Sequence, residues 1–256
     1  MSVVVTELPE VGITLLSRWI FNCFVVHDGG GGRPLVVDPG LPSTAAAAWS
    51  LLRSRRVRGV PVVAATHGHG DHVGGLPTLR RHDAEVALPI RIRSYLDGER
   101  PRSPGPRAVA RIAPVLRDQP RSLRSLLEVA RCSRHTGYDS RRARFPTPPE
   151  HWLADGDEVP GAPDWQVIQT PGHTDDSTSL WNPRTRVLLS GDAVIAVGGR
   201  AWFTPELVDE AAAAATEERL RSLPATYLLP GHGRPVIGAR VMDHALGPTE
   251  RPPRFR

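Results

Sequence analysis

The sequence contains no lysine, and all 32 of its basic residues are arginine. Together with 24 glycines, 26 prolines and abundant alanine, this composition indicates a coding bias toward high GC content and carries no functional signal. Two cysteines are too few for a disulfide framework or a cysteine-based metal site. No signal-like segment opens the chain, and no apolar run approaches membrane-spanning length. These absences predict a reduced, cytoplasmic setting.

The most informative motif is the run Thr66–His72, which reads Thr-His-Gly-His-Gly-Asp-His. It follows a short apolar segment, residues 60–65, that is typical of a buried strand. On an extended chain His67 and His69 project to the same side and can bind one ion, whereas Asp71 and His72 can be directed to a second. A lone histidine is usually solvated or hydrogen-bonded, but this pattern arises by chance in only roughly one such sequence in a thousand. The run therefore predicts a metal-dependent enzyme.

Three later motifs have a common form, in which a short apolar run ends in a tight turn that contains glycine. These turns carry His173, Asp192 and His232. Strands that each deliver a side chain at their carboxyl ends build a site at one edge of a sheet. One dinuclear site is predicted from the following seven residues: His67, His69, Asp71, His72, His173, Asp192 and His232.

With these motifs in order, and with Asp38 in the run Val-Val-Asp-Pro-Gly, the chain resembles the metallo-β-lactamase fold superfamily of metal-dependent hydrolases. The resemblance implies that Asp192 bridges two ions and that Asp38 braces the loop that carries the ligands. It also implies two ligand sets: His67, His69 and His173 for the first ion, and Asp71, His72 and His232 for the second.

The bridging carboxylate distinguishes branches within that superfamily. Enzymes that resemble true β-lactamases lack it, so Asp192 argues against antibiotic hydrolysis and favours the glyoxalase II, lactonase and thioesterase branches. The chain departs from these at residues 174–177, which read Thr-Asp-Asp-Ser where relatives often have Thr-Pro-Gly-Ser. Only 24 residues follow His232, which leaves no room for the glutathione-binding helical domain of glyoxalase II and disfavours glutathione thioesters.

The donor set determines the expected chemistry. Imidazole and carboxylate donors suit two divalent ions, with Zn²⁺ expected and Mn²⁺ or Fe²⁺ tolerated. Two such ions lower the pKa of a shared water toward neutrality, which supplies the nucleophile. Neither Cys23 nor Cys132 lies near a histidine motif in the sequence, and Asp71 is the candidate to orient the nucleophile or protonate the leaving group.

We therefore expect a dinuclear metal-dependent hydrolase that uses a metal-bridging hydroxide to cleave a thioester, a lactone or a related ester. Its partner would be a small-molecule substrate. Two alternatives stay open: a metal-dependent phosphodiesterase or nuclease, and a mononuclear iron oxidoreductase that resembles a persulfide dioxygenase. A binding protein without catalysis is less favoured, because every expected ligand is present.

For the architecture, the resemblance implies a single α/β domain over residues 1–256, built as a four-layer αββα sandwich. Strands are expected over residues 20–27 and 34–38, joined by a glycine-rich hairpin loop. Helices are expected over residues 44–52, with Ser43 as the N-cap, and over residues 205–223.

Residues 80–145, the Arg-rich segment, carry 16 of the 32 arginines but only 7 acidic residues. We expect a partly helical insertion at about residues 80–146, beside the metal site. The arginines could form a solvated surface, hold an anionic arm of the substrate, or contact a nucleic-acid backbone. Nucleic acid is disfavoured because the only aromatic residues there are Tyr95, Tyr138 and Phe145.

Two further expectations concern the pocket. The spacing of Leu123, Leu126, Leu127 and Ala130 predicts an amphipathic helix that packs on the core, lines a pocket or meets a partner. Residues 194–206, with Trp202 and Phe203, are expected to wall the substrate pocket together with arginines of residues 117–134. Five histidines lie outside the motifs and are expected to be dispensable: His27, His82, His135, His151 and His244.

Overall fold

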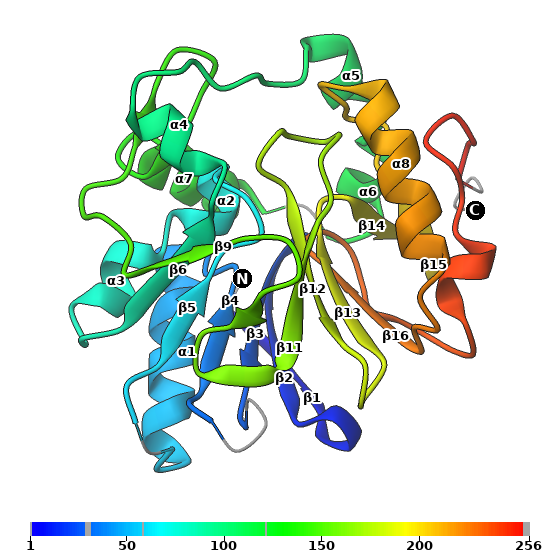
Figure 1. Ribbon diagram of the computed structural model, residues 1–256. Coiled ribbons are helices and arrows are strands. Elements are labelled where there is room, and N and C mark those ends of the chain that lie inside the picture. Colours follow the sequence, from blue (N-terminus) through cyan, green and yellow to red (C-terminus); the bar gives the residue numbers. More distant parts are fainter. Residues whose placement is uncertain (1, 29–31, 58, 121, 253–256) are drawn as a thin grey trace.

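Two β-sheets packed face to face form the centre of the molecule (Figure 1). The computed structural model describes residues 2–28, 32–57, 59–120 and 122–252. The first sheet has the order β1-β2-β3-β4-β5-β6-β9, and the second has the order β10-β11-β12-β13-β16-β17. The strands of the first sheet are β1 (Val4–Leu8), β2 (Ile13–Arg18), β3 (Phe21–Val26), β4 (Leu35–Val37), β5 (Val62–Ala64), β6 (Glu85–Pro89) and β9 (His151–Leu153). Those of the second are β10 (Glu158–Val159), β11 (Ala162–Gln169), β12 (Thr178–Asn182), β13 (Val187–Gly191), β16 (Tyr227–Pro230) and β17 (Val236–Ile237).

Each sheet combines antiparallel and parallel pairing. In the first, β1 to β4 pair antiparallel, and β4, β5, β6 and β9 pair parallel. In the second, β13 and β16 form the parallel pair between antiparallel neighbours. The predicted strands at 20–27 and 34–38 correspond to β3 and β4, which do pair antiparallel, although residues 29–31 of the expected loop lie outside the described residues.

The alternation of side chains along the strands produces the layers. In β3, Phe24 and Val26 enter the core between the sheets, whereas Cys23 and Val25 face the helices outside. Helices α1 (Pro42–Ser54) and α3 (Leu76–Arg80) cover the outer face of the first sheet. Helix α8 (Glu210–Arg221) and the 3-10 helix η2 (Val241–His244) cover the second. This arrangement confirms the expected αββα sandwich.

Two helix starts differ from the sequence-based expectation. Helix α8 begins at residue 210 and not at 205, because the Asp209 side chain accepts the N–H of Ala212 at 3.0 Å and acts as its N-cap. Ser43 does not cap α1, which starts at Pro42 with Leu41 in the N-cap position. Instead, the Ser43 Oγ accepts a hydrogen bond from Arg18 at 2.6 Å.

The Arg-rich segment forms a group of short elements between β6 and β9. In Figure 1 its helices lie mostly in the upper half of the picture, coloured green. Its elements are α4 (Ile92–Leu96), α5 (Pro106–Arg111), α6 (Ala113–Arg117), α7 (Leu123–Cys132), β7 (Gly137–Tyr138) and β8 (Ala143–Arg144). The remaining elements are η1 (Pro9–Val11), α2 (Gly70–Val73), β14 (Val194–Val197) and β15 (Arg200–Phe203).

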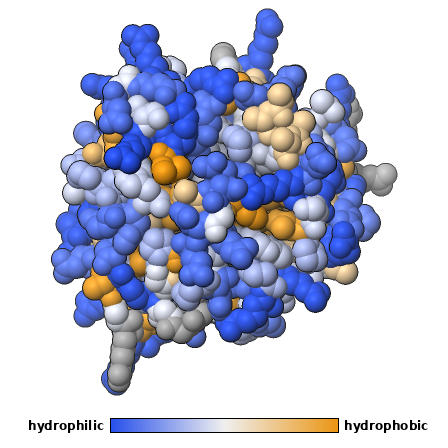
Figure 2. Space-filling view, in the orientation of Figure 1, coloured by the Kyte–Doolittle hydropathy of each residue, from blue (hydrophilic) through white to orange (hydrophobic). Residues whose placement is uncertain are grey.

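Helix α7 is amphipathic as predicted, but its leucine stripe does not pack on the core. Leu123, Leu126 and Leu127 are 76%, 44% and 57% exposed. Packing on the core was the first of the three expectations for this stripe, and it is wrong. The face of the molecule in Figure 2 is mostly hydrophilic, with small hydrophobic patches. No helix among the described residues is long and apolar enough to cross a membrane.

A substitution of Trp165 in β11 tests the assignment of the core between the sheets. It is almost fully buried, so Trp165→Ala should leave a cavity and lower the free energy of unfolding by about 3–5 kcal/mol. Its neighbour Gln166 is exposed on the same strand, so Gln166→Ala should change that free energy by less than about 0.5 kcal/mol. Urea unfolding followed by circular dichroism measures both values, and equal losses would contradict the assignment of this core.

Candidate metal centre

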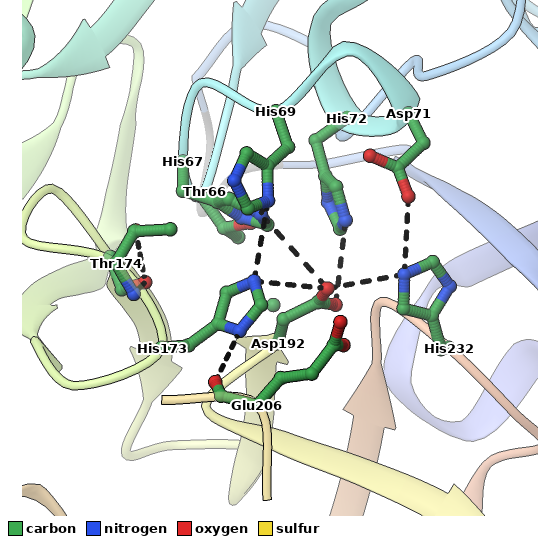
Figure 3. Close-up of polar contacts among 12 residues, drawn as sticks. Thr66, His67, His69, Asp71, His72, His173, Thr174, Asp192, Glu206 and His232 are labelled. Atoms are coloured by element: carbon green, nitrogen blue, oxygen red, sulfur yellow. Dashed lines mark hydrogen bonds and ion pairs between the residues drawn. The ribbon is translucent and has the colours of Figure 1, made fainter. Parts of the chain in front are cut away.

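All seven predicted ligand side chains lie at one edge of the sandwich, where strands of both sheets end. The Thr66–His72 loop follows β5 and leads into α2, whereas His173, Asp192 and His232 follow β11, β13 and β16. Because the two sheets contribute neighbouring strand ends, residues separated by more than 160 positions in the chain come together (Figure 3).

A first group of three nitrogen atoms consists of His67, His69 and His173. The His69 Nδ1 lies 3.0 Å from the Nε2 of His67 and 3.3 Å from the Nε2 of His173. Burial, reinforced by the neighbouring imidazoles, lowers the pKa of His67 well below its ordinary value and that of His69 to about 3. Both rings are therefore neutral at pH 7, and each retains a nitrogen lone pair for a cation.

A second group consists of Asp71, His72 and His232, and Asp192 lies between the two groups. The Asp192 Oδ2 is 3.1 Å from the Nε2 of His232 and 3.6 Å from that of His173. Its Oδ1 is 3.4 Å from the Nε2 of His72. Asp192 thus reaches members of both groups, which is the position that a bridging carboxylate requires.

Charge is balanced within this buried cluster. Burial opposes a charge on His72 and His232, but the facing carboxylates, above all Asp192, raise the pKa of both rings, that of His232 to about 10. Burial also opposes the charge on Asp71, yet His232 and His72 hold the pKa of Asp71 below its usual range. Protons on the His72 and His232 rings therefore compensate the negative charge of the facing carboxylates. Bound divalent ions would provide the same compensation.

The outer ring nitrogens of the ligand candidates have fixed partners. The Nδ1 of His173 donates to the backbone oxygen of Glu206 at 2.8 Å, and that of His232 donates to the oxygen of Ile20 at 3.3 Å. A carbonyl can only accept, so the Nδ1 of each ring points away from the site and the Nε2 points into it; on His232 a bound ion would take the place of the Nε2 proton.

Asp38 braces the loop, as the resemblance implied. Its two carboxylate oxygens accept the backbone N–H of Thr66 at 2.7 Å and the Thr66 hydroxyl at 2.8 Å. Its Oδ2 also lies 3.0 Å from the Nδ1 of His72. One buried carboxylate therefore orients both the start of the loop and one of the ligand candidates.

Asp176 is a supporting residue that sequence reasoning missed. Its carboxylate is buried and accepts the backbone N–H of Gly68 at 2.8 Å and the hydroxyl of Tyr138. The Tyr138 ring packs against His69 with centroids 5.1 Å apart. The departure from the expected pattern at residues 174–177 was the signal, and it marks a second brace of the ligand loop.

Cys132 also lies closer to the site than its sequence position indicated. Its Sγ is 3.8 Å from the backbone oxygen of Gly70, at the start of α2. Burial raises the pKa of the Cys132 thiol to about 11, so the sulfur packs against the loop as a neutral group.

Close backbone approach makes two glycines necessary. A Cβ at Gly40 would lie 1.4 Å from the backbone oxygen of Asp71, and one at Gly231 would lie 2.5 Å from the Asp192 Oδ1. Any side chain at either position would displace a ligand candidate.

Two buried donor atoms that lack hydrogen-bond partners within the described part of the chain show that these residues suit metal ions. The Nε2 of His72 and the Oδ1 of Asp192 are buried and have no hydrogen-bond partner among the described residues. Burying a polar atom without a hydrogen-bond partner costs free energy of folding. A cation between this nitrogen and this oxygen would give both atoms a partner. Nitrogen and oxygen donors of this kind suit Zn²⁺, Mn²⁺ or Fe²⁺.

A pocket of about 380 Å³, the metal-site pocket, contains five of the ligand candidates: His69, Asp71, His173, Asp192 and His232. Neither Trp202 nor Phe203 lines it, because both side chains are buried in core clusters. Their predicted place in the pocket wall is therefore wrong. Within the 194–206 loop it is Glu206 that lines the pocket.

The arginines predicted as a second wall are also absent from the lining, since none of its described residues is an arginine. Arg117, Arg124 and Arg131 are exposed, and Arg121 lies outside the described residues. The five histidines outside the motifs do not line it either. His82, for example, stacks on Trp49, and His151 contacts Glu85 at 2.8 Å.

Comparison with known proteins agrees with this geometry. The family model described as the metallo-beta-lactamase superfamily matches residues 18–232. A probable metallo-hydrolase of Bacillus subtilis, YflN, is 28% identical over 80% of this chain and 76% of its own length. A hydroxyacylglutathione hydrolase of Bdellovibrio bacteriovorus is 24% identical over 68% of this chain, which spans only 49% of that relative.

Among solved structures, the BLEG-1 B3 metallo-beta-lactamase superposes with a TM-score of 0.60 at 20% identity, covering 90% of this chain and 95% of that one. At this identity the likeness concerns the fold alone. The matched family model, however, spans most of the chain and all seven ligand candidates. The chain therefore belongs to the metallo-beta-lactamase superfamily.

Proposed function

We propose that the protein is a dinuclear metal-dependent hydrolase that cleaves a thioester, a lactone or a related ester. The observation that carries this proposal is the position of Asp192, whose carboxylate oxygens lie within 3.1–3.6 Å of nitrogen atoms from both ligand groups. The superfamily, and relatives named metallo-hydrolase and hydroxyacylglutathione hydrolase, support hydrolysis.

One ion would be held by the first group, His67, His69 and His173. The other ion would be held by the second group, Asp71, His72 and His232, and Asp192 would bind both ions. When bound, such a pair of ions, for which we expect Zn²⁺, supplies an activated water and polarises the oxygen of the scissile bond. The protein's own contribution is position, because Asp38 and Asp176 hold the loop and the backbone oxygens of Ile20 and Glu206 fix two imidazoles.

Asp71 is the proposed residue for proton transfer. Its carboxylate lines the pocket, and its Oδ2 lies 3.3 Å from the Nε2 of His232. The contact with His232 uses Oδ2, which leaves Oδ1 to accept a proton from water and deliver it to the leaving oxygen or sulfur. The low pKa of Asp71 keeps the carboxylate ionised, as a metal ligand requires.

A panel of a small ester, a thioester, a lactone and a phosphodiester tests the class of reaction. We expect turnover of the carboxylic esters and none of the phosphodiester. Preferential cleavage of the phosphodiester would favour the phosphodiesterase alternative, and oxygen consumption by an iron-loaded preparation would favour the oxidoreductase.

The metal content should be about two ions per chain after reconstitution with excess Zn²⁺ or Mn²⁺, because we propose two ligand groups, His67/His69/His173 and Asp71/His72/His232, that share the Asp192 carboxylate. Elemental analysis of protein purified without chelator measures this ratio. A ratio that stays at one would contradict the dinuclear site.

Asp192→Ala should lower kcat by about 100-fold or more, because it removes the group that would fix both ions relative to one another. His151→Ala is the control, since His151 contacts Glu85 outside the site and should leave kcat unchanged. Steady-state kinetics with matched circular dichroism spectra test the pair, and the reverse order of effects would show that the site is misassigned.

Asp38→Asn should weaken the binding of one ion by about 10–100-fold, because the amide loses the charge that faces His72. The exposed Asp243, which pairs with Arg240, provides the control Asp243→Asn with unchanged affinity. Competition with a chromogenic chelator measures both. Equal loss at the two ion sites, or no loss, would show that Asp38 acts only on the fold.

A further inference from the structure

The lining of the metal-site pocket outside the ligand candidates is largely apolar. Most of its apolar side chains come from two places in the chain, residues 19–21 between β2 and β3 and the helical part of the Arg-rich segment, and Ser103, Pro104 and Glu206 complete it. The first contributes Trp-Ile-Phe, and the second contributes Val109, Ile112, Leu116 and Leu126. These two groups are called the aromatic wall and the helical wall.

The aromatic wall is tied directly to the metal centre. Phe21 pairs with His232 in an isolated β-bridge, and their rings lie 5.5 Å apart in an edge-to-face arrangement. The side-chain amide of the adjacent Asn22 donates to the backbone oxygens of Pro230 and Gly233 at 2.9 and 2.7 Å. This wall therefore keeps a fixed distance from the ligand candidates.

The helical wall packs against the aromatic wall and against the body of the protein. Val115 of α6 is buried in one cluster with Trp19, Ile195 and Trp202. Glu128 of α7 pairs with Arg18 and accepts the backbone N–H of Ser43 at 2.7 Å. Nevertheless, Val109 and Leu126 are each 44% exposed, so apolar surface of this anchored wall remains open to a ligand.

The charges in the pocket disfavour an anionic ligand group. Besides the ligand candidates, the only charged side chain of its described lining is Glu206, whose carboxylate has no hydrogen bond or ion pair with a described residue. Of the arginines that flank this lining in the sequence, Arg18 and Arg102 pair with Glu128 and Asp175, whereas Arg107, Arg111 and Arg124 are exposed and do not line the pocket. A carboxylate or phosphate beside the apolar walls would therefore meet no arginine among the described lining residues.

We propose that the metal-site pocket binds an uncharged, linear alkyl acyl chain, held between the aromatic wall and the helical wall with its scissile carbonyl at the metals. This inference rests on the proposed hydrolase function and specifies its substrate class. The apolar walls supply the affinity, and the absence of arginine in the described lining selects against acyl chains with a terminal anion.

The first test measures kcat/KM for a series of 4-nitrophenyl esters from acetyl to octanoyl with the metal-loaded enzyme. Each added methylene that enters the pocket should raise kcat/KM about three- to fourfold, until the pocket is filled. The monoester of glutaric acid, which ends in a carboxylate, should react at least about tenfold more slowly than the pentanoyl ester of equal length.

Two neighbouring leucines of α7 provide matched variants. Leu126 lines the pocket, whereas Leu127 is 57% exposed and does not line it. Leu126→Asp should lower the ratio of kcat/KM for octanoyl and acetyl esters at least tenfold, and Leu127→Asp should leave that ratio unchanged. Both positions are well exposed, so both variants should fold, and elemental analysis checks that each retains its metal.

Unreactive 2-alkanones of increasing chain length provide a readout without turnover. Calorimetric titration should show binding that strengthens with chain length in the wild type and in Leu127→Asp, but not in Leu126→Asp. Acetyl ester turnover without any chain-length dependence, or a preference for the glutaric monoester, would overturn the inference and leave the proposed function intact. No turnover of any ester by protein with two ions would instead overturn the proposed function, and the 2-alkanone titration would then decide the inference alone.

Discussion

The site depends on the burial of the Asp192 carboxylate among imidazole rings. A carboxylate that is 5% exposed must be compensated by positive charge or by hydrogen-bond donors, since its desolvation costs several kcal/mol. Here protonated His72 and His232 provide that compensation, and the Oδ1 of Asp192 still lacks a hydrogen-bond partner among the described residues. Two divalent ions satisfy the same electrostatic requirement with donors that are already in position.

Such a cluster of buried polar groups requires rigid support, and much of the surrounding structure provides it. Asp38 and Asp176 each use a buried carboxylate to hold the backbone of the ligand loop, one at Thr66 and the other at Gly68. Gly40 and Gly231 allow the backbone to approach the ligand candidates more closely than any other residue would permit. The two sheets provide the platform, because the ends of β5, β11, β13 and β16 meet at one edge of the sandwich.

The basic side chains and the apolar side chains of the Arg-rich segment have different places in the structure. Its arginines pair with acidic residues or lie on the surface, whereas its apolar side chains line the metal-site pocket. The contacts of Val115 and Glu128 hold these side chains beside the aromatic wall, in one cluster with Trp19. A strongly basic segment can therefore contribute a neutral, apolar surface to a site rich in carboxylates.

The sequence by itself determined the family, the layer order and the positions of the ligand candidates. These features are local, because each candidate stands within a few residues of an apolar strand and a glycine turn, and the alternation along β3 to β5 already separates the two faces of the sheet. Asp38 was also recognisable, since it follows β4 in a motif of the same form.

Only the tertiary structure decided which side chains surround that centre. The contacts of Asp176 with Gly68, of Cys132 with Gly70, and of Phe21 with His232 each join residues 62 or more positions apart, and no local periodicity encodes them. For the same reason the sequence could not show that Trp202 enters the core while Leu126 stays exposed in the pocket. Hydrophobic residue type sets the gain from burial, but the packing of distant elements decides which apolar side chains are buried and which remain available to a ligand.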